Sequence, residues 1–207
     1  MSRIQTYTGR SMGCNAYLIE GPEGYVLVDA PDGAASWVAQ QLPHGASLNH
    51  LLITHQHFDH VEEAAALQER FGCTVHAHSS YSPALTLEEL GAGWGLPPVS
   101  SFRVDDAFGS AKISADWGGL SWKIFHIPGH AADGVAYLLQ DENRVFVGDI
   151  LFAGSVGRTD FPGGSMSQLV RGIRTHLLTL DPHTEVFCGH GPTTTIGEEL
   201  LNNPYTA

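Results

Sequence analysis

The sequence predicts a mixed α/β fold, of the α+β type, in which two packed sheets are covered by helices on their outer faces. Short apolar runs, typical of buried strands, recur along the chain, and each ends in a polar residue. Helical patterns lie between these runs, and the middle of the chain carries a hairpin-rich block of strands. This mixture suits two sheets with helices outside better than one doubly wound parallel sheet.

The first forty residues predict a hairpin followed by a helix. Strands are expected at Asn15–Glu20 and Gly24–Asp29, because the intervening Gly21-Pro22-Glu23 is a turn sequence. A helix is expected from about Ala34 to Leu42.

Five strand-like runs end at an aspartate or a histidine. They are Tyr25–Val28 before Asp29, Leu51–Ile53 before His55, Lys123–Ile127 before His130, Arg144–Val147 before Asp149, and Glu185–Cys188 before His190. Loops at strand ends are where a rigid scaffold places functional groups. We therefore expect these side chains to converge.

Two further helices and two pairs of strands complete the prediction. Helices are expected at Val61–Arg70 and Ser165–Leu180, where apolar residues recur at a spacing of three to four. Hairpin strands are expected from about Ala111 to Ile127 and from Val135 to Val147, and Gly91–Pro98 predicts a long loop. Because no linker-like stretch or repeat divides the chain, residues 1–207 are expected to form one domain.

The composition excludes several classes of partner. The chain is 43% hydrophobic and 15% charged, which is enough apolar material for a core. Its net charge is −12 and it has no run of Lys or Arg, so we expect neither nucleic acid nor an anionic membrane as a partner. Three cysteines without a C-x-x-C pair do not indicate a disulfide scaffold. Without a signal-peptide pattern or an apolar run of roughly 18 residues, we expect a soluble, cytoplasmic protein.

The strongest signal in the sequence is Thr54-His55-Gln56-His57-Phe58-Asp59-His60. Side chains alternate along a strand, so His55 and His57 point to the same face and can bind one cation. Asp59 and His60 fall where a helix is expected to begin, which directs them to a neighbouring position that suits a second cation. Burying these polar groups without a cation would be costly.

Structural roles are the alternative for several of these residues. Asp59 could cap the following helix, with Glu62 as its capping-box partner. Taken singly, His130, Asp149 and His190 could be ordinary turn or loop residues, but their shared position after apolar strands favours metal ligands. The remaining histidines are assigned no metal role, including the i, i+2 pair His76 and His78, which lacks a carboxylate nearby in sequence: His44, His50, His76, His78, His126, His176 and His183.

The motif T-H-x-H-x-D-H, followed by Pro128-Gly129-His130, Gly148-Asp149 and Gly189-His190, resembles the metallo-β-lactamase superfamily over essentially the whole chain. The resemblance implies a four-layer αββα sandwich. The segment Gly157–Phe161 and the tail from Gly189-His190-Gly191-Pro192 through Asn203-Pro204-Tyr205 narrow it to the glyoxalase II-like (hydroxyacylglutathione hydrolase) branch, in its short bacterial form.

This resemblance implies a centre of two divalent metal ions. It assigns the ligands as follows: His55, His57 and His130 on the first ion, Asp59, His60 and His190 on the second, and Asp149 bridging both. Asp29 would orient the loops that carry the ligands without binding a metal itself; a turn residue at a strand end is the alternative. The mixture of imidazole and carboxylate favours zinc, although iron or manganese also suits it.

The expected activity is hydrolysis of a small-molecule thioester, S-D-lactoylglutathione or a related hydroxyacyl thioester. Two divalent ions about 3.5–4 Å apart lower the pKa of a water between them towards about 7, and the resulting hydroxide would attack the carbonyl. Asp59 is expected to be a ligand and also the carboxylate that orients this water or accepts its proton. The bridging Asp149 argues against a true β-lactamase, so antibiotic hydrolysis is expected to be weak at most.

The residues expected to recognise glutathione match the resemblance only in part. Arg158 matches a basic position that contacts glutathione in relatives, which makes it the candidate for gripping a carboxylate; a surface ion pair is the alternative. The chain ends soon after Pro204 without a helical extension, Pro192 stands where relatives have tyrosine, and Ala131–Gly134 replaces the Thr-x-Gly-His/Ser of many relatives.

Two other functions compete with thioester hydrolysis. The first is a persulfide dioxygenase, which has the same fold and binds one iron through the equivalents of His55, His130 and Asp149. Its relatives usually carry a tyrosine where this chain has Pro192, so this function ranks second. A metal-binding module without turnover is the third reading, and no missing ligand supports it. The sequence makes no prediction of the oligomeric state.

Overall fold

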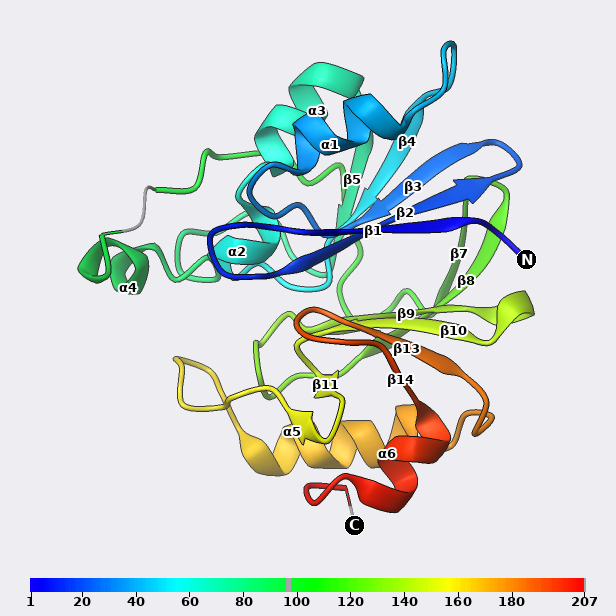
Figure 1. Ribbon diagram of the computed structural model, residues 1–207. Helices are drawn as coiled ribbons and strands as arrows, with labels where there is room; N and C mark the ends of the chain where they lie inside the picture. The colour runs from blue at the N-terminus through cyan, green and yellow to red at the C-terminus, as the bar shows by residue number, and fades with distance from the viewer. Residues whose placement is uncertain (96–97, 207) are drawn as a thin grey trace.

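The computed structural model describes residues 1–95 and 98–206 and shows four layers, with two sheets packed between two layers of helices (Figure 1). Helices α1 (Ala34–Gln41) and α3 (Ala64–Phe71) cover one sheet. Helices α5 (Met166–Gly172) and α6 (Ile196–Asn202) cover the other. The predicted αββα sandwich is therefore confirmed.

The first sheet joins an antiparallel hairpin to parallel strands. Its strands, in spatial order, are β1 (Ile4–Thr8), β2 (Asn15–Gly21), β3 (Gly24–Val28), β4 (Leu48–Leu52), β5 (Thr74–Ala77) and β6 (Asp106–Ala107). Strands β3 to β6 are parallel, and parallel neighbours need crossover connections. Helices α1 and α3 lie in the first two of these crossovers, so β3 and β4 end at the same edge.

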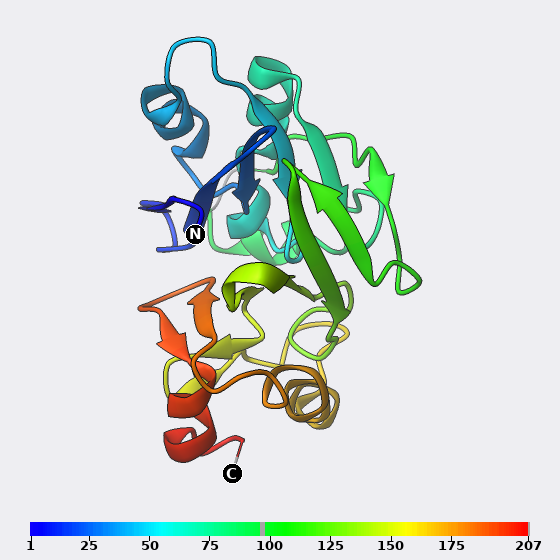
Figure 2. The ribbon, with the colours of Figure 1, turned by 90° about the vertical axis from the view of Figure 1, so that its right-hand side faces the viewer.

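The second sheet is mostly antiparallel. Its strands, in spatial order, are β14 (Thr194–Thr195), β13 (Glu185–Cys188), β10 (Arg144–Gly148), β9 (Val135–Leu139), β8 (Leu120–His126) and β7 (Ser114–Trp117). Only β10 and β13 run parallel, with α5 in the crossover between them. A small hairpin, β11 (Leu151–Phe152) and β12 (Ser155–Val156), stands apart. Figure 2 shows the N-terminal strands above the C-terminal ones.

The core between the sheets follows from the two-residue period of strands. Tyr17 and Ile19 of β2 face the second sheet, whereas Leu18 between them packs in the cluster beneath α1 and α3. Trp122 and Tyr137 of the second sheet fill the space opposite and are fully buried. Each large apolar side chain buried in this way stabilises the fold by roughly 1.5–3 kcal/mol, which fixes how the two sheets lie against each other.

The single helix expected at Val61–Arg70 is instead two helices, α2 (Phe58–Val61) and α3. The carboxylates at the break bind the loop before α1 and its first turn. Glu62 Oε2 accepts from the Asp32 backbone N–H at 3.0 Å, and Glu63 Oε2 accepts from the Ala35 backbone N–H at 2.7 Å. The bond to Ala35 satisfies one of the N–H groups that the start of α1 leaves without partners.

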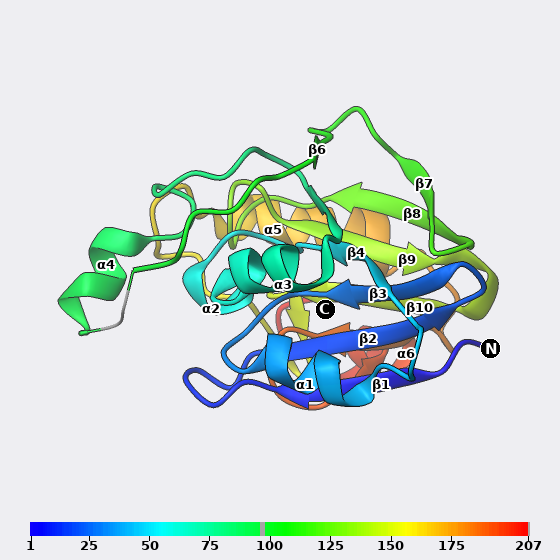
Figure 3. The same cartoon turned by 90° about the horizontal axis from the view of Figure 1, so that it is seen from above.

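Two other expected segments differ in detail. The helix expected at Ser165–Leu180 is α5, capped by Ser165, followed by a π-helical segment at Ile173–Leu177. The loop expected at Gly91–Pro98 begins inside α4 (Glu88–Gly93), which extends away from the sandwich (Figure 3); residues 96 and 97 lie outside the described residues. None of the helices in the described ranges has the length and hydropathy to cross a bilayer.

Candidate metal centre

The ends of β4, β8, β10 and β13 meet at one edge of the sandwich, and small residues let them approach closely. A Cβ on Gly148 would lie 2.4 Å from Thr54 Oγ1, and Gly148 has a φ of +50° that favours glycine. A Cβ on Gly189 would lie 2.3 Å from Asp149 Oδ1. Gly148 and Gly189, which precede Asp149 and His190, therefore leave the space that these metal donors need to lie close together.

His55, His57 and His130 form a first group of donors whose ligand atoms all lie within 4.8 Å of one another. The Nε2 atoms of His55 and His130 are 3.2 Å apart, close to the roughly 3.3 Å expected for two imidazoles on one tetrahedral zinc. Burial, together with the neighbouring imidazoles, lowers the pKa of His55 well below its usual value and that of His57 to about 3. Both are thus neutral at pH 7, the state that binds metal.

Asp59, His60 and His190 form a second group, together with Cys14. Asp59 Oδ2 lies 3.1 Å from His190 Nε2 and 4.0 Å from His60 Nε2. Helix α2 begins after His57 and has no side-chain cap, and Asp59 lies in its first turn with its carboxylate directed at His190. The capping box of Asp59 and Glu62, the structural alternative for this aspartate, is therefore not formed.

Asp149 lies between the two groups. Its Oδ2 is 3.5 Å from His130 Nε2 in the first group and 3.6 Å from His190 Nε2 in the second. Its Oδ1 is 3.3 Å from His60 Nε2. Burial raises its pKa, but the surrounding imidazoles outweigh this and lower the pKa below its usual value. An ionised carboxylate at this point can contact cations in both groups.

The Nδ1 atoms of His55, His60 and His130 form hydrogen bonds with other residues. Asp29 Oδ2 accepts from His60 Nδ1 at 2.8 Å and from Thr54 Oγ1 at 2.8 Å. Since the hydroxyl proton of Thr54 is used there, its oxygen accepts from His55 Nδ1 at 3.2 Å. The carbonyl of Arg158 accepts from His130 Nδ1 at 2.8 Å. These bonds leave the Nε2 atoms free for a metal, and such partners orient metal-binding imidazoles.

Unsatisfied polar atoms in the cluster match the need for cations. Among the described residues, His60 Nε2 and Asp149 Oδ1 are buried without a hydrogen-bond partner, an arrangement that is normally costly. Burial lowers the pKa of His60, yet the nearby carboxylates of Asp29, Asp149 and Asp59 outweigh this and raise it well above its usual value. The site therefore favours positive charge, and the donors fit divalent ions.

Two buried residues of this region had no role in the sequence prediction. Cys14 has its Sγ in the second donor group, and burial raises its pKa to about 12. Asp133 Oδ2 accepts from the Gln56 backbone N–H at 3.1 Å, and burial raises the pKa of its carboxyl to about 6. No local pattern marks either residue, because both reach the site through the packing of distant loops.

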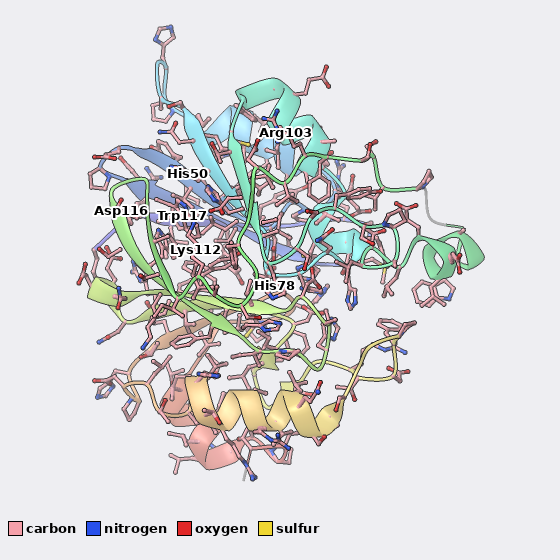
Figure 4. All side chains as sticks on the ribbon, turned by 180° about the vertical axis from the view of Figure 1, so that it is seen from behind. His50, His78, Arg103, Lys112, Asp116 and Trp117 are labelled. Carbon is pink, nitrogen blue, oxygen red and sulfur yellow. The ribbon has the colours of Figure 1, made fainter. Side chains whose placement is uncertain are left out.

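Four of the histidines assigned no metal role, His50, His76, His78 and His126, form side-chain hydrogen bonds away from the donors. No carboxylate lies near His76 in sequence, but the fold brings one from 30 residues away. His76 Nδ1 donates to Asp106 Oδ2 at 3.1 Å, and its Nε2 accepts from His50 Nδ1 at 3.0 Å. In the view from behind, His50 lies near Trp117, Lys112 and Asp116 (Figure 4). Among the described residues, no third donor joins His50 and His76 at coordination distance.

A pocket of about 300 Å³ opens onto the donors, and Arg158 lines it. The Arg158 guanidinium makes two hydrogen bonds of 2.7 Å to the Asp160 carboxylate and lies 4.1 Å from the centre of the Phe161 ring. This geometry is the surface ion pair that the sequence left open. A larger cavity of about 840 Å³ lies next to the pocket and shares Leu87, but contains none of the donors.

Comparison with known proteins gives concordant matches along the chain. A family model for the metallo-beta-lactamase superfamily matches residues 9–190. Hydroxyacylglutathione hydrolase GloC of Haemophilus influenzae is 34% identical, over 92% of each chain. The crystal structure of BLEG-1 B3 metallo-beta-lactamase has a TM-score of 0.90 at 30% identity, covering 99% of this chain and 100% of that one. The crystal structure of TTHA1623 in a di-iron-bound form has a TM-score of 0.85 at 35% identity, covering 97% of this chain and 99% of that one.

Proposed function

Because the chain belongs to the metallo-β-lactamase superfamily, we propose that it is a metal-dependent hydrolase that uses two divalent ions to cleave a small-molecule thioester. The observation that carries this proposal is the pair of donor groups joined by Asp149. A single metal in the first group would leave the second group, with Asp59 and His60, buried without a cation. Two ions satisfy both groups.

The chemistry divides between the ions and the residues of the chain. When bound, the ions lower the pKa of a water towards about 7 and polarise the carbonyl oxygen of the substrate. Burial raises the pKa of Asp59, but His60 and the bond to His190 outweigh this and lower it. Asp59 is therefore ionised, and its carboxylate orients the attacking water or accepts its proton. A thiolate leaves readily, so the chain needs no strong general acid.

Zinc is the proposed metal. Imidazole and carboxylate ligands suit zinc, and the same donors also accept iron or manganese. The relative TTHA1623 was solved with two irons, which supports a site for two ions but favours a different metal. Reconstitution with each metal in turn therefore belongs in the test.

The substrate proposal starts from the relative in Haemophilus influenzae, whose name is hydroxyacylglutathione hydrolase. The decisive experiment is an anaerobic assay of the metal-loaded protein on S-D-lactoylglutathione and a panel of other acyl thioesters. We expect thiol release that is lowered at least 100-fold in Asp59→Asn and unchanged in Asp116→Asn, an aspartate on β7 away from the donors.

Three results would contradict the proposal. Oxygen uptake with glutathione persulfide by protein holding one iron would identify a dioxygenase instead. Faster hydrolysis of a chromogenic cephalosporin than of any thioester would identify a β-lactamase, the activity in the name of BLEG-1. A metal-replete protein inert on every substrate would leave a binding module.

A further inference from the structure

The pocket over the metal donors has an apolar part beside them, the apolar wall. Its members are Met12, Phe58, Leu87, Trp94 and Phe161. Trp94 and Met12 keep 54% and 47% of their surface exposed. Large apolar side chains exposed together around a pocket are typical of a surface that binds an apolar group.

The aromatic rings of this wall are arranged around the donors. The ring centre of Trp94 lies 6.4 Å from that of Phe58 and 6.3 Å from that of Phe161. The Phe161 ring in turn lies perpendicular to His57, at 5.6 Å between centres. An aromatic or aliphatic group that packs against Trp94 and Phe161 would thus lie beside the first donor group.

The backbone before α4 is held in an uncommon conformation. Leu87 has a φ of +57°, a region that non-glycine residues rarely occupy. Its side chain is only 6% exposed and lines both the metal pocket and the neighbouring cavity. Such strain is often found at functional sites, and Leu87 directly precedes α4, which Trp94 follows.

Away from the proposed metal ions, the described side chains around the pocket offer no free cation to an anionic carrier. Among the described residues that line it, Arg158 is the only Lys or Arg, and Asp160 already pairs with its guanidinium. The neighbouring cavity is lined by Glu88 and Glu89, with no Lys or Arg among its described residues. Glutathione carries two carboxylates and one ammonium group, and the part of it that extends beyond the metal ions into this cavity would meet Glu88 and Glu89, where the structure describes no free Lys or Arg to bind its carboxylates.

We propose that this site selects thioesters that carry no negative charge and have an aromatic or branched aliphatic acyl group, with Trp94 and Phe161 as the residues that bind this group. The inference rests on the proposed thioester hydrolysis and specifies its substrate class. The thiol part of such a substrate is a neutral carrier, in place of glutathione.

The test compares acyl groups on one neutral carrier. With the zinc-loaded protein, we expect kcat/KM for S-benzoyl-N-acetylcysteamine to exceed that for S-acetyl-N-acetylcysteamine by at least 10-fold, and to exceed that for S-D-lactoylglutathione. Trp94→Ala should remove most of the 10-fold preference through a higher KM, with little change for the acetyl substrate. Leu201→Ala, an exposed apolar residue on α6, is the matched control.

A charge reversal tests the electrostatic part separately. Glu89 is exposed at the neighbouring cavity, and Glu89→Lys should raise kcat/KM for the glutathione thioester several-fold while leaving the neutral substrates unchanged. Fluorescence titration with an uncleavable benzyl thioether of N-acetylcysteamine should show binding to the unmodified protein that Trp94→Ala weakens about 10-fold.

The failures of the two proposals are distinguishable. If no thioester is hydrolysed, the proposed function is wrong. If S-D-lactoylglutathione is the best substrate and Trp94→Ala changes neither the acyl preference nor thioether binding, thioester hydrolysis stands and the inferred substrate class is wrong.

Discussion

At the scale of single residues, two buried aspartates outside the proposed ligand set hold the donor loop after β4. Asp29 accepts from the Thr54 backbone N–H at 2.8 Å as well as from the Thr54 hydroxyl and His60. Asp133 accepts from the Gln56 backbone N–H. The loop is therefore fixed from both sheets before any metal binds.

Asp29→Asn tests this support. The amide presents one acceptor oxygen in place of two, so it cannot accept from the Thr54 backbone N–H as well as from the Thr54 hydroxyl and His60, which share Oδ2. We expect the affinity for the second metal to fall 10- to 100-fold, measured by titration against a chelator. Asp32→Asn, in the same loop with a partly exposed side chain, is the control; equal affinity in the two variants would contradict the proposed support.

Asp133→Asn tests the charge at the second aspartate. In the folded protein the pKa of the Asp133 carboxyl is about 6, above its ordinary value of 3.8. The folded state therefore binds this proton more tightly than the unfolded state, and the free energy of unfolding falls as the pH rises from about 3.8 to 6. In metal-free protein, Asp133→Asn should raise the free energy of unfolding by on the order of 1–3 kcal/mol at pH 8 and much less at pH 4. Urea unfolding at both pH values measures this, and an equal effect at both would refute it.

At the scale of elements, the loop that carries His130 is locked against the start of α5. Gly129 has a φ of +138°, and a Cβ there would lie 2.5 Å from the backbone nitrogen of Leu169. The Ser165 backbone N–H donates to the Gly129 carbonyl at 2.7 Å. A helix on the outside of the sandwich thus positions a donor at its edge.

Gly129→Ala is expected to lower the free energy of unfolding by about 2–5 kcal/mol, because overpacking adds to backbone strain. The control is Gly154→Ala, which also has a positive φ but nothing within 4 Å of the added Cβ, and should cost only about 1–2 kcal/mol. Denaturant melts compare the two. A loss in Gly129→Ala no larger than in the control would show that α5 does not lock this loop.

The elements that the sequence predicted well are those with local signals. Strands β2 and β3 and helix α1 lie within about one residue of their expected bounds, because a turn sequence and a regular apolar pattern mark them. The break between α2 and α3 was missed because it depends on bonds from Glu62 and Glu63 to a distant loop. The short strands β6, β11 and β14 carry no pattern of their own.

At the scale of the whole molecule, the donors come from both halves of the chain. His55, His57, Asp59 and His60 follow β4 of the first sheet, whereas the remaining proposed ligands follow strands of the second. Ions bound between them would cross-link the two sheets. Since a ligand that binds only the folded state stabilises it, metal should stabilise the entire sandwich.

Removing the metals should therefore lower the melting temperature by on the order of 10 °C. Thermal unfolding of loaded protein, of protein treated with a chelator, and of treated protein after zinc is restored measures this. The midpoint should recover with zinc and should not recover with magnesium, which suits oxygen ligands. An unchanged midpoint after complete removal would show that the sheets do not depend on the ions.

The way in which the whole chain folds explains which parts of the site could be predicted from the sequence. The seven proposed ligands lie together as expected, because each follows a strand whose end is fixed by the fold. Cys14 was missed because it reaches His190 only through the packing of the β1–β2 loop against the end of β13. Asp133 was missed for the same reason, since its partner Gln56 is 77 residues away.

The central claim is that two ions bind one chain, and metal analysis by mass spectrometry of stripped and zinc-reconstituted protein tests it most directly. We predict two zinc ions per chain in the unmodified protein and about one in His190→Ala, which keeps the first donor group intact. One ion per chain in both proteins would contradict the claim.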